Sequence, residues 1–260
     1  MKSTVRLELT NQGQVARITL AAPTANILDR AMMLNLLETV EGLSWDGVLK
    51  VILLSSEGPH FSFGASVQEH MPEHIKPTLA HLRELLRALA LAPAVTLAAV
   101  RGQCLGGGFE LALACDAIAA DDTAQFALPE IKLGVFPPAG AAFLPVRIGA
   151  SRAAELVLTG ASWTAPQALA AGLVQKVMPA PEFQAQVEKW LETDFLPRSA
   201  ASLRYAAQAT RRPLLHALKH ELPDLEELYL NELMREPDAV EGIRAFLEKR
   251  QPRWMAGPAA

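Results

Sequence analysis

The stretch from Ala92 to Asp116 constrains the fold more than any other part of the chain. It reads APAVTLAAV, then RGQCLGGG, then FELALACD, which predicts an apolar strand, a turn with three consecutive glycines and an apolar helix. A strand without charged residues is typically buried on both faces, so other elements must cover it. Strand, loop and helix alternate along much of the chain, and this order predicts an α/β fold built in layers.

Further segments extend this prediction. VRLEL and VARITL flank the turn TNQG and predict a β-hairpin, while VLKVILLSS predicts a buried strand. Apolar spacing predicts helices over 29–43 and 76–91, and we expect CDAIAA and AQFALPEIKLG to form further short strands. Helical patterns dominate from about Pro197. We therefore divide the chain into an α/β core of residues 1–196 and a helical oligomerisation region of residues 197–260.

Composition and charge exclude several classes of protein. The chain of 260 residues has a net charge of −4, which argues against a nucleic-acid-binding surface. The longest uncharged apolar stretch, 88–100, contains Pro93 and is too short to span a membrane, and the N-terminus lacks the pattern of a signal peptide. Cys104 and Cys115 lack CxxC spacing and are expected to be reduced. We predict a soluble, cytoplasmic protein without nucleic-acid or membrane partners.

The glycines Gly106 to Gly108 lie where a strand is expected to give way to a helix. The first N–H groups of a helix have no partner within it, and glycine lets a ligand approach them closely. Phosphate-binding patterns such as GxxxxGK[ST] and GxGxxG are absent. The donors therefore suit a carbonyl oxygen that becomes negative during a reaction, although the glycines alone are equally consistent with close packing of helix on strand.

Two carboxylates, Glu110 and Glu130, have mainly apolar neighbours in the sequence. Burial raises the pKa of a carboxyl group toward neutrality, where it can exchange protons with a substrate. The alternative is structural: each glutamate caps a helix or pairs with Arg101 or Lys132. The residue pattern leaves both interpretations open.

Two other pairs of residues receive structural interpretations. His216 and His220 have a spacing that metal ligands can have, but no third ligand is evident, so we expect an exposed helix face and no metal site. Arg211 and Arg212 either contact phosphates or cover the end of a helix, and we favour the second interpretation.

Five segments, in order along the chain, together resemble the crotonase, or enoyl-CoA hydratase/isomerase, superfamily. They are APTANILD, FSFGAS, RGQCLGGGFELALACD, PEIKLGVFP and EGIRAFLEKRQPRW. The resemblance implies a spiral of ββα units with a C-terminal helical trimerisation region, assembled as a homotrimer or as a hexamer of two trimers. It implies a hydro-lyase that acts on acyl-CoA thioesters and needs no cofactor, because CoA is part of the substrate.

The resemblance also implies roles for individual residues. The N–H groups of Ala65 and Gly107 would form an oxyanion hole for the thioester oxygen. Glu110 would orient and deprotonate the attacking water, and Glu130 would donate a proton to carbon. Attack by water places negative charge on the thioester oxygen, so two N–H groups there would stabilise the transition state.

The contacts to CoA that the family implies fall at two ends of the chain. Ala25, Asn26 and Ile27 would lie near the pantetheine and the adenine. Lys249 would reach the nucleotide bound to a neighbouring subunit, and Phe246 would pack in the same interface.

Two departures from the usual hydratase pattern suggest an altered acyl pocket. Ser66 replaces the aspartate of the common Gly-Ala-Asp sequence, and PPAGAAF over 137–143 replaces a loop richer in glycine. Together with EGPHFSFGASVQEHMP, these features are most similar to the family's hydratases of cyclohexa-1,5-diene-1-carbonyl-CoA. Phe136, Pro138 and Phe143, with Ser66, would then line a pocket for a flat ring.

That similarity implies formation of 6-hydroxycyclohex-1-ene-1-carbonyl-CoA in anaerobic benzoyl-CoA degradation. Hydration or isomerisation of an ordinary enoyl-CoA is one alternative, and hydrolysis of another acyl-CoA is a second. A non-catalytic binding protein is a third, against which both retained glutamates argue.

Overall fold

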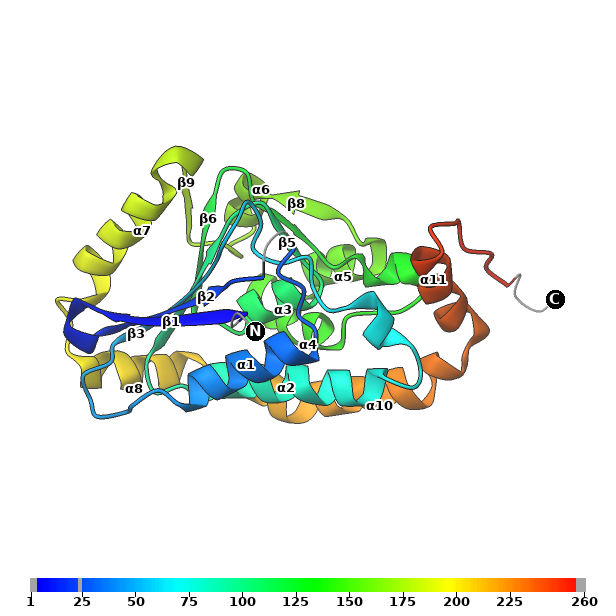
Figure 1. The fold of residues 1–260 in the computed structure, drawn as a ribbon, viewed down its shortest axis with the longest axis horizontal. Helices are drawn as coiled ribbons and strands as arrows, with labels where there is room; N and C mark the ends of the chain where they lie inside the picture. Colours follow the sequence, from blue (N-terminus) through cyan, green and yellow to red (C-terminus); the bar gives the residue numbers. More distant parts are fainter. Residues whose placement is uncertain (1–3, 23–24, 256–260) are drawn as a thin grey trace.

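The computed structural model describes residues 4–22 and 25–255 and shows a mixed sheet with helices on both faces (Figure 1). The order of the six strands is β1-β2-β3-β4-β6-β9. Their bounds are β1 Val5–Thr10, β2 Val15–Leu20, β3 Val51–Ser56, β4 Val95–Val100, β6 Ala117–Asp121 and β9 Lys176–Met178. Strands β1 and β2 pair antiparallel, which confirms the predicted hairpin, and every other pairing in this sheet is parallel.

A second, smaller sheet carries the glycine-rich turn. Its order is β5-β7-β8, with β5 over Gln103–Leu105, β7 over Gln125–Ala127 and β8 over Ser162–Thr164. Strand β5 therefore lies between β4 and the glycines, an element that the sequence did not reveal. The segment Pro129–Leu133, predicted as part of a strand, is a 3₁₀ helix instead, because Pro129 starts a turn that Gly134 ends with a φ of 74°.

Helices cover both faces of the large sheet. The helices of the first part are α1 Arg30–Glu41, α2 Ile75–Leu91, α3 Gly107–Leu113, α4 Pro138–Ile148, α5 Ala150–Thr159, α6 Ala165–Ala170 and α7 Phe183–Trp190. Those after Pro197 are α8 Ala200–Thr210, α9 Arg212–His216, α10 Leu222–Asn231 and α11 Pro237–Leu247. Helices α1 and α2 agree closely with the predicted ranges. Within the described ranges, no helix is both long enough and apolar enough to cross a membrane.

Alternation along the strands separates two parts of the core. Ile18 and Ile52 face the cluster that includes α1, α2 and α3, whereas Leu53 and Leu97 face the cluster that includes α7. Helices after Pro197 contribute residues to both clusters, so they share the core of the first part of the chain. That these helices form an oligomerisation region stays a prediction.

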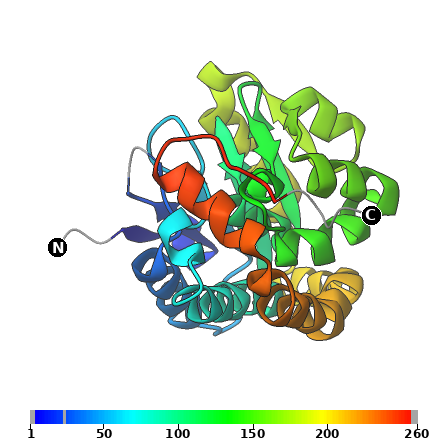
Figure 2. The same cartoon turned by 90° about the vertical axis from the view of Figure 1, so that its right-hand side faces the viewer.

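Different helices cover the lower face and the two ends of the molecule. In Figure 1, α1, α2 and α10 run together below the sheet, and α7 and α11 lie at opposite ends. Figure 2 looks onto the end that carries α11, where this helix contacts the 3₁₀ helices Val67–His70 and Pro129–Leu133. Helix α11 therefore covers the segment that follows Ala65 and the segment that carries Glu130.

Candidate active site

The glycine-rich turn lies directly beneath the segment Phe61–Ala65. The N–H of Leu105 donates to the carbonyl of Ser62 at 3.0 Å, and the N–H of Phe61 donates to the carbonyl of Gln103 at 3.0 Å. A methyl group in place of the Gly64 hydrogen would lie 2.7 Å from the carbonyl oxygen of Leu105. Only glycine therefore lets the two backbone segments approach this closely.

This approach brings the two predicted oxyanion donors together. A methyl group on Gly107 would lie 3.3 Å from the backbone nitrogen of Ala65. Gly107 is the first residue of α3, so its N–H has no acceptor within the helix. Neither N–H donates to an acceptor among the residues that the structure describes. The two free donors form a site suited to a single anionic oxygen.

Glu110 lies in the first turn of α3, as predicted, and is 4% exposed. A methyl group on Gly107 would lie 3.8 Å from its Oε2, which places this carboxyl beside the two free N–H groups. Its Oε1 accepts a hydrogen bond of 2.7 Å from the N–H of Gly140 in α4. Burial raises the pKa of Glu110 to about 7, while the N–H groups of Gly140 and Ala139 oppose the shift.

Glu130 approaches the same turn at the preceding glycine, Gly106. A methyl group on Gly106, which has a φ of 49°, would lie 2.6 Å from Oε1 of Glu130. Its Oε2 is buried and has no hydrogen-bond partner in the described ranges. Burial raises the pKa of Glu130 well above its usual range, and the charge of Glu110 raises it further. Neither glutamate forms an ion pair with Arg101 or Lys132 in the described chain.

Two groups on α10 belong to the same electrostatic environment, and sequence reasoning missed both. The charge of Glu226 raises the pKa of Glu110, and the charges of Glu130 and Glu110 raise the pKa of the Tyr229 hydroxyl, which burial raises most. Both side chains lie on the buried face of α10 with Leu222. A glutamate within an apolar helical stripe was the signal available in the sequence.

A cavity of about 730 Å³ leads along the outside of the turn. Ala65, Leu105 and Pro129 line it on one side, next to Gly64, Gly106 and Glu130 in the sequence. Helix α11 of the same chain lines the other side with Gly242 and Phe246. The lining is largely apolar, so the cavity suits an extended, mainly apolar ligand that carries a carbonyl group toward the free N–H groups.

The pattern that describes the family Enoyl-CoA hydratase/isomerase matches residues 10–257. The chain belongs to this family. It is 41% identical over 252 residues to cyclohexa-1,5-dienecarbonyl-CoA hydratase of Thauera aromatica, with 97% of each chain covered. It is 36% identical to 2,3-dehydroadipyl-CoA hydratase of Escherichia coli K12, with 95% of this chain and 97% of that protein covered. The protein is therefore a hydro-lyase of the enoyl-CoA hydratase type.

Solved structures agree with this assignment of family and fold. An enoyl-CoA hydratase from Mycobacterium avium subsp. paratuberculosis K-10 superposes with a TM-score of 0.86 at 30% identity, covering 97% of this chain and 99% of the other. An enoyl-CoA hydratase from Bacillus halodurans gives a TM-score of 0.85 at 26% identity, covering 94% and 100%. The predicted crotonase-like α/β fold is confirmed.

The residues assigned to CoA lie in different settings in this family member. Ile27 and Phe246 line the large cavity, and Lys249 is exposed just beyond α11. The Asn26 side chain is buried and bonds to the backbone at Ala22, Glu57 and His60, so it shapes the loop and has no free group to offer. Ala25 is half-buried beside it, and Pro23 and Thr24 of the same motif lie outside the described residues.

The residues assigned to the acyl pocket are more scattered. Ser66 lines the large cavity next to Ala65. Phe136 packs edge-on against Tyr229 with ring centroids 5.4 Å apart, and Pro138 is buried at the start of α4. Phe143 is completely buried in the main core. Lys132, which the sequence suggested as a partner for a glutamate, instead lines the large cavity.

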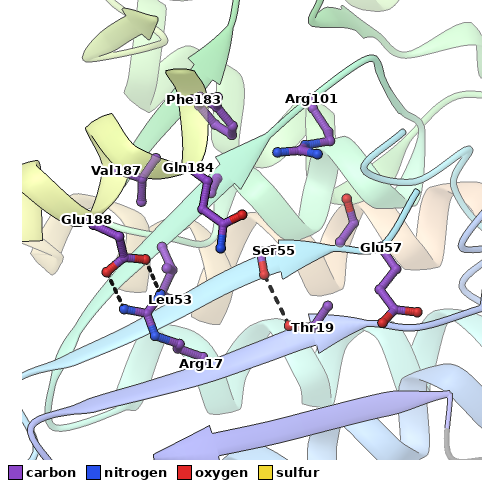
Figure 3. Close-up of a pocket in the computed structure, with 12 residues that line it drawn as sticks. Arg17, Thr19, Leu53, Ser55, Glu57, Arg101, Phe183, Gln184, Val187 and Glu188 are labelled. Carbon is purple, nitrogen blue, oxygen red and sulfur yellow. Dashed lines mark hydrogen bonds and ion pairs between the residues drawn. The ribbon is translucent and has the colours of Figure 1, made fainter. Parts of the chain in front are cut away.

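A second cavity, of about 360 Å³, lies between the large sheet and α7 (Figure 3). Arg17 forms an ion pair with Glu188 there, and Thr19 bonds to Ser55 at 3.2 Å. Arg101 reaches this cavity and lies over the ring of Phe183 at 5.5 Å from its centroid. Arg101 therefore lines a cavity to which neither Glu110 nor Glu130 contributes.

The expectation that the Arg211 side chain only covers the end of a helix is wrong, because the side chain is buried. It is 3% exposed and donates to Oδ1 of Asp116 at 2.7 Å and to the carbonyl of Ala94 at 2.6 Å. Its neighbour Arg212 is exposed. His216 and His220 are exposed as predicted, and no group of three metal-ligating side chains is found in the described ranges.

Proposed function

We propose that the protein hydrates cyclohexa-1,5-diene-1-carbonyl-CoA to 6-hydroxycyclohex-1-ene-1-carbonyl-CoA, a step of anaerobic benzoyl-CoA degradation. The observation that carries the proposal is the convergence of two unpaired N–H groups, those of Ala65 and Gly107, with the buried carboxyl of Glu110. Glu130 contacts the same turn at Gly106. The substrate name comes from the relative that is 41% identical.

The first step uses the donors and Glu110. With the thioester oxygen between the N–H groups of Ala65 and Gly107, the Glu110 carboxylate takes a proton from water as its oxygen bonds to the β carbon. The electron pair of the carbon–carbon double bond moves onto the thioester oxygen and forms an enolate. Two N–H groups held in place before reaction stabilise this charge more than they stabilise the neutral carbonyl.

The second step uses Glu130. In a cyclic diene the enolate extends over the remaining double bond, so a proton from Glu130 can add to the ring carbon remote from the thioester. The double bond next to the thioester is thereby restored. Glu110 now carries a proton and Glu130 has lost one, and transfer between them through solvent restores the resting site. The raised pKa of Glu130 suits a group that must hold its proton at neutral pH.

The cavity suggests how CoA is held. We propose that its pantetheine follows the apolar lining between Ile27 and Phe246, and that Lys132 lies near its phosphates, while Lys249 reaches the nucleotide of CoA bound to a neighbouring subunit. Large apolar side chains exposed after Pro197 support the proposed trimer or hexamer: Leu228, Phe246, Leu247, Trp254 and Met255. Light scattering on the purified protein measures this assembly. A cytoplasmic location completes the proposal.

The substrate is tested with two thioesters. Purified protein is mixed with the cyclic dienoyl-CoA or with crotonyl-CoA, and the gain of one water is followed by mass spectrometry. We expect kcat/KM to favour the cyclic substrate by about 100-fold, a difference that binding in a shaped pocket can supply. Hydration in D2O should place deuterium on the ring carbon remote from the thioester.

Preference for crotonyl-CoA, with deuterium next to the thioester, would replace the proposal with ordinary enoyl-CoA hydration. The similarity to 2,3-dehydroadipyl-CoA hydratase makes a linear acyl group the specific alternative. The two substrates share the first step and differ in where the proton is delivered. With the cyclic substrate, the position of deuterium therefore tests, independently of the rates, whether the proton is delivered to the remote ring carbon.

A further inference from the structure

Two buried polar atoms near the glutamates have no partner among the described residues. One is Oε2 of Glu130, and the other is the hydroxyl oxygen of Tyr229. Tyr229 is 1% exposed and lies in an apolar cluster with Ile75, Leu79 and Val135. A buried hydroxyl without a hydrogen bond destabilises the fold, because it has lost its bonds to water and gained none in return. Packing alone would favour phenylalanine, so the hydroxyl needs a different explanation.

Tyr229 packs close to the segments that carry or position the two glutamates. Its ring packs edge-on against Phe136, with centroids 5.4 Å apart. Phe136 follows closely after the 3₁₀ helix that carries Glu130, and the N–H of Val135 donates to the carbonyl of Glu130 at 3.2 Å. Helix α10 packs against α4, whose Gly140 holds Glu110. The ring of Tyr229 thus contacts the segment that carries Glu130, and its helix contacts the helix that positions Glu110.

The charged groups around Tyr229 keep its hydroxyl a donor. Burial raises the pKa of the Tyr229 hydroxyl most, and negative charge on Glu130 or Glu110 raises it further, so the phenol keeps its proton before and after Glu130 gives up its own. Glu226, one turn earlier on α10, already uses its carboxyl in an ion pair with Arg83 of α2. Oε2 of Glu130 is a buried acceptor without a hydrogen bond, and it lies on the segment against which Tyr229 packs.

We propose that Tyr229 is a positioning residue, whose hydroxyl donates a hydrogen bond to the Glu130 carboxyl through one bridging water. This inference rests on the proposed acid role of Glu130. When Glu130 gives its proton to carbon, its electron pair stays on the carboxylate, and the hydrogen bond stabilises the new charge. The same bond fixes the orientation of the carboxyl before the transfer. A water held between two buried polar groups is common in protein interiors.

The chain offers a matched test, because its two tyrosines differ in burial: Tyr205 is 63% exposed. We expect Tyr229→Phe to lower kcat by about 10- to 100-fold, the range for a hydrogen bond to a charged group, with KM nearly unchanged. The basic limb of the kcat/KM profile should move to higher pH, because loss of the donor destabilises the Glu130 carboxylate. Tyr205→Phe should leave both measurements as in the wild type.

Packing alone predicts a different result. Phenylalanine keeps the ring contact with Phe136, so a structural role would leave kcat and the pH profile unchanged in Tyr229→Phe. That result would overturn the proposal. Thermal melting of both variants shows whether the fold is kept, and a loss of kcat in a folded Tyr229→Phe protein supports the proposal.

A measurement without substrate separates this inference from the proposed function. Protein labelled with 3-fluorotyrosine in a Tyr205→Phe background gives a single ¹⁹F resonance, from Tyr229. We expect this resonance to shift with pH as the glutamates titrate, and we expect Glu130→Gln to reduce that shift. A pH response unaffected by Glu130→Gln would overturn the hydrogen bond even in an active enzyme. A reduced response in a protein inactive on both thioesters would support the bond and reject the proposed function.

Discussion

Arg211 is buried, Asp116 is partly buried, and each has several hydrogen-bond partners, whereas Glu110 and Glu130 are buried with few. All three nitrogens of the Arg211 guanidinium donate. Nε and Nη2 donate to Asp116, Nη1 donates to the carbonyl of Ala92, and Nη2 also donates to the carbonyl of Ala94, just before β4. Asp116 also accepts from the N–H of Thr96 at 2.8 Å. Glu110 has backbone donors at the start of α4, and Oε2 of Glu130 has none in the described chain.

The difference shows which buried charges stabilise the fold and which serve the reaction. A paired charge that is fully hydrogen-bonded joins distant segments, here the end of α8 and the sheet. A carboxyl with too few partners has a raised pKa and destabilises its own charged form. Evolution tolerates that loss where a proton must be exchanged. Burial alone does not distinguish a charge that stabilises the fold from one that serves the reaction. The number of hydrogen-bond partners does.

The largest expected effect comes from Glu130→Gln. The amide cannot donate a proton to carbon, so kcat should fall by about 10²–10⁴-fold, the usual contribution of a general acid. The melting temperature should be unchanged or higher, because a neutral side chain replaces a buried carboxyl. Turnover is followed by product mass and folding by circular dichroism. Nearly normal turnover would show that the two glutamates do not divide the reaction as proposed.

Arg211→Met should act in the opposite way. It leaves the Asp116 carboxylate without its charged partner, and breaking a buried pair costs about 3–5 kcal/mol of unfolding free energy. Activity per folded molecule should stay close to normal, because neither residue lines the large cavity. Arg212→Met, a change at the exposed neighbour, is the control in urea denaturation. Equal stability of the two variants would contradict the role given to Arg211.

The pH dependence of stability should reveal the penalty on Glu110. Its pKa is raised to about 7 in the folded protein, so folding favours the protonated form. The stabilisation is complete below about pH 4.5 and disappears as the pH rises through 7. Relative to Glu110→Gln, the wild type should lose on the order of 3 kcal/mol over this range, because each tenfold difference in proton affinity corresponds to about 1.4 kcal/mol.

Urea midpoints of the wild type and Glu110→Gln, measured on either side of pH 7, test this expectation. Glu8→Gln serves as the control, because Glu8 is exposed on β1. A difference between wild type and Glu110→Gln that stays constant with pH would mean that the Glu110 carboxyl is not penalised by burial.

What the sequence predicted correctly is mostly local. A strand, three glycines and an apolar helix are neighbours in the chain. The turn, and the place of Glu110 in the first turn of α3, therefore followed from the order of residues alone. The hairpin and α2 followed from alternation and helical spacing for the same reason. Pro129 and Gly134 gave a local signal for the 3₁₀ helix, but the segment AQFALPEIKLG was interpreted as a single strand.

The errors and omissions concern contacts between distant segments. Arg211 bonds to Asp116, which lies 95 residues earlier in the chain, and no spacing rule could pair them. Glu226 and Tyr229 meet the site only because α10 packs beneath α4 and α2. The approach of Ala65 to Gly107 is equally non-local, and there the family resemblance supplied what the residue pattern could not.

The smallest expected effect comes from Glu226, which stands between the two kinds of buried charge. It is 6% exposed and has one ion partner, Arg83, and burial raises its pKa to about 7. Its negative charge raises the pKa of Glu110, so Glu226→Gln should move the acidic limb of the kcat/KM profile to lower pH by a fraction of a unit. The plateau should be unchanged, because Glu226 is given no proton to transfer. Glu227→Gln, at the exposed neighbour, should leave the limb in place, and a shift of equal size in both variants would show that α10 acts only through its overall charge.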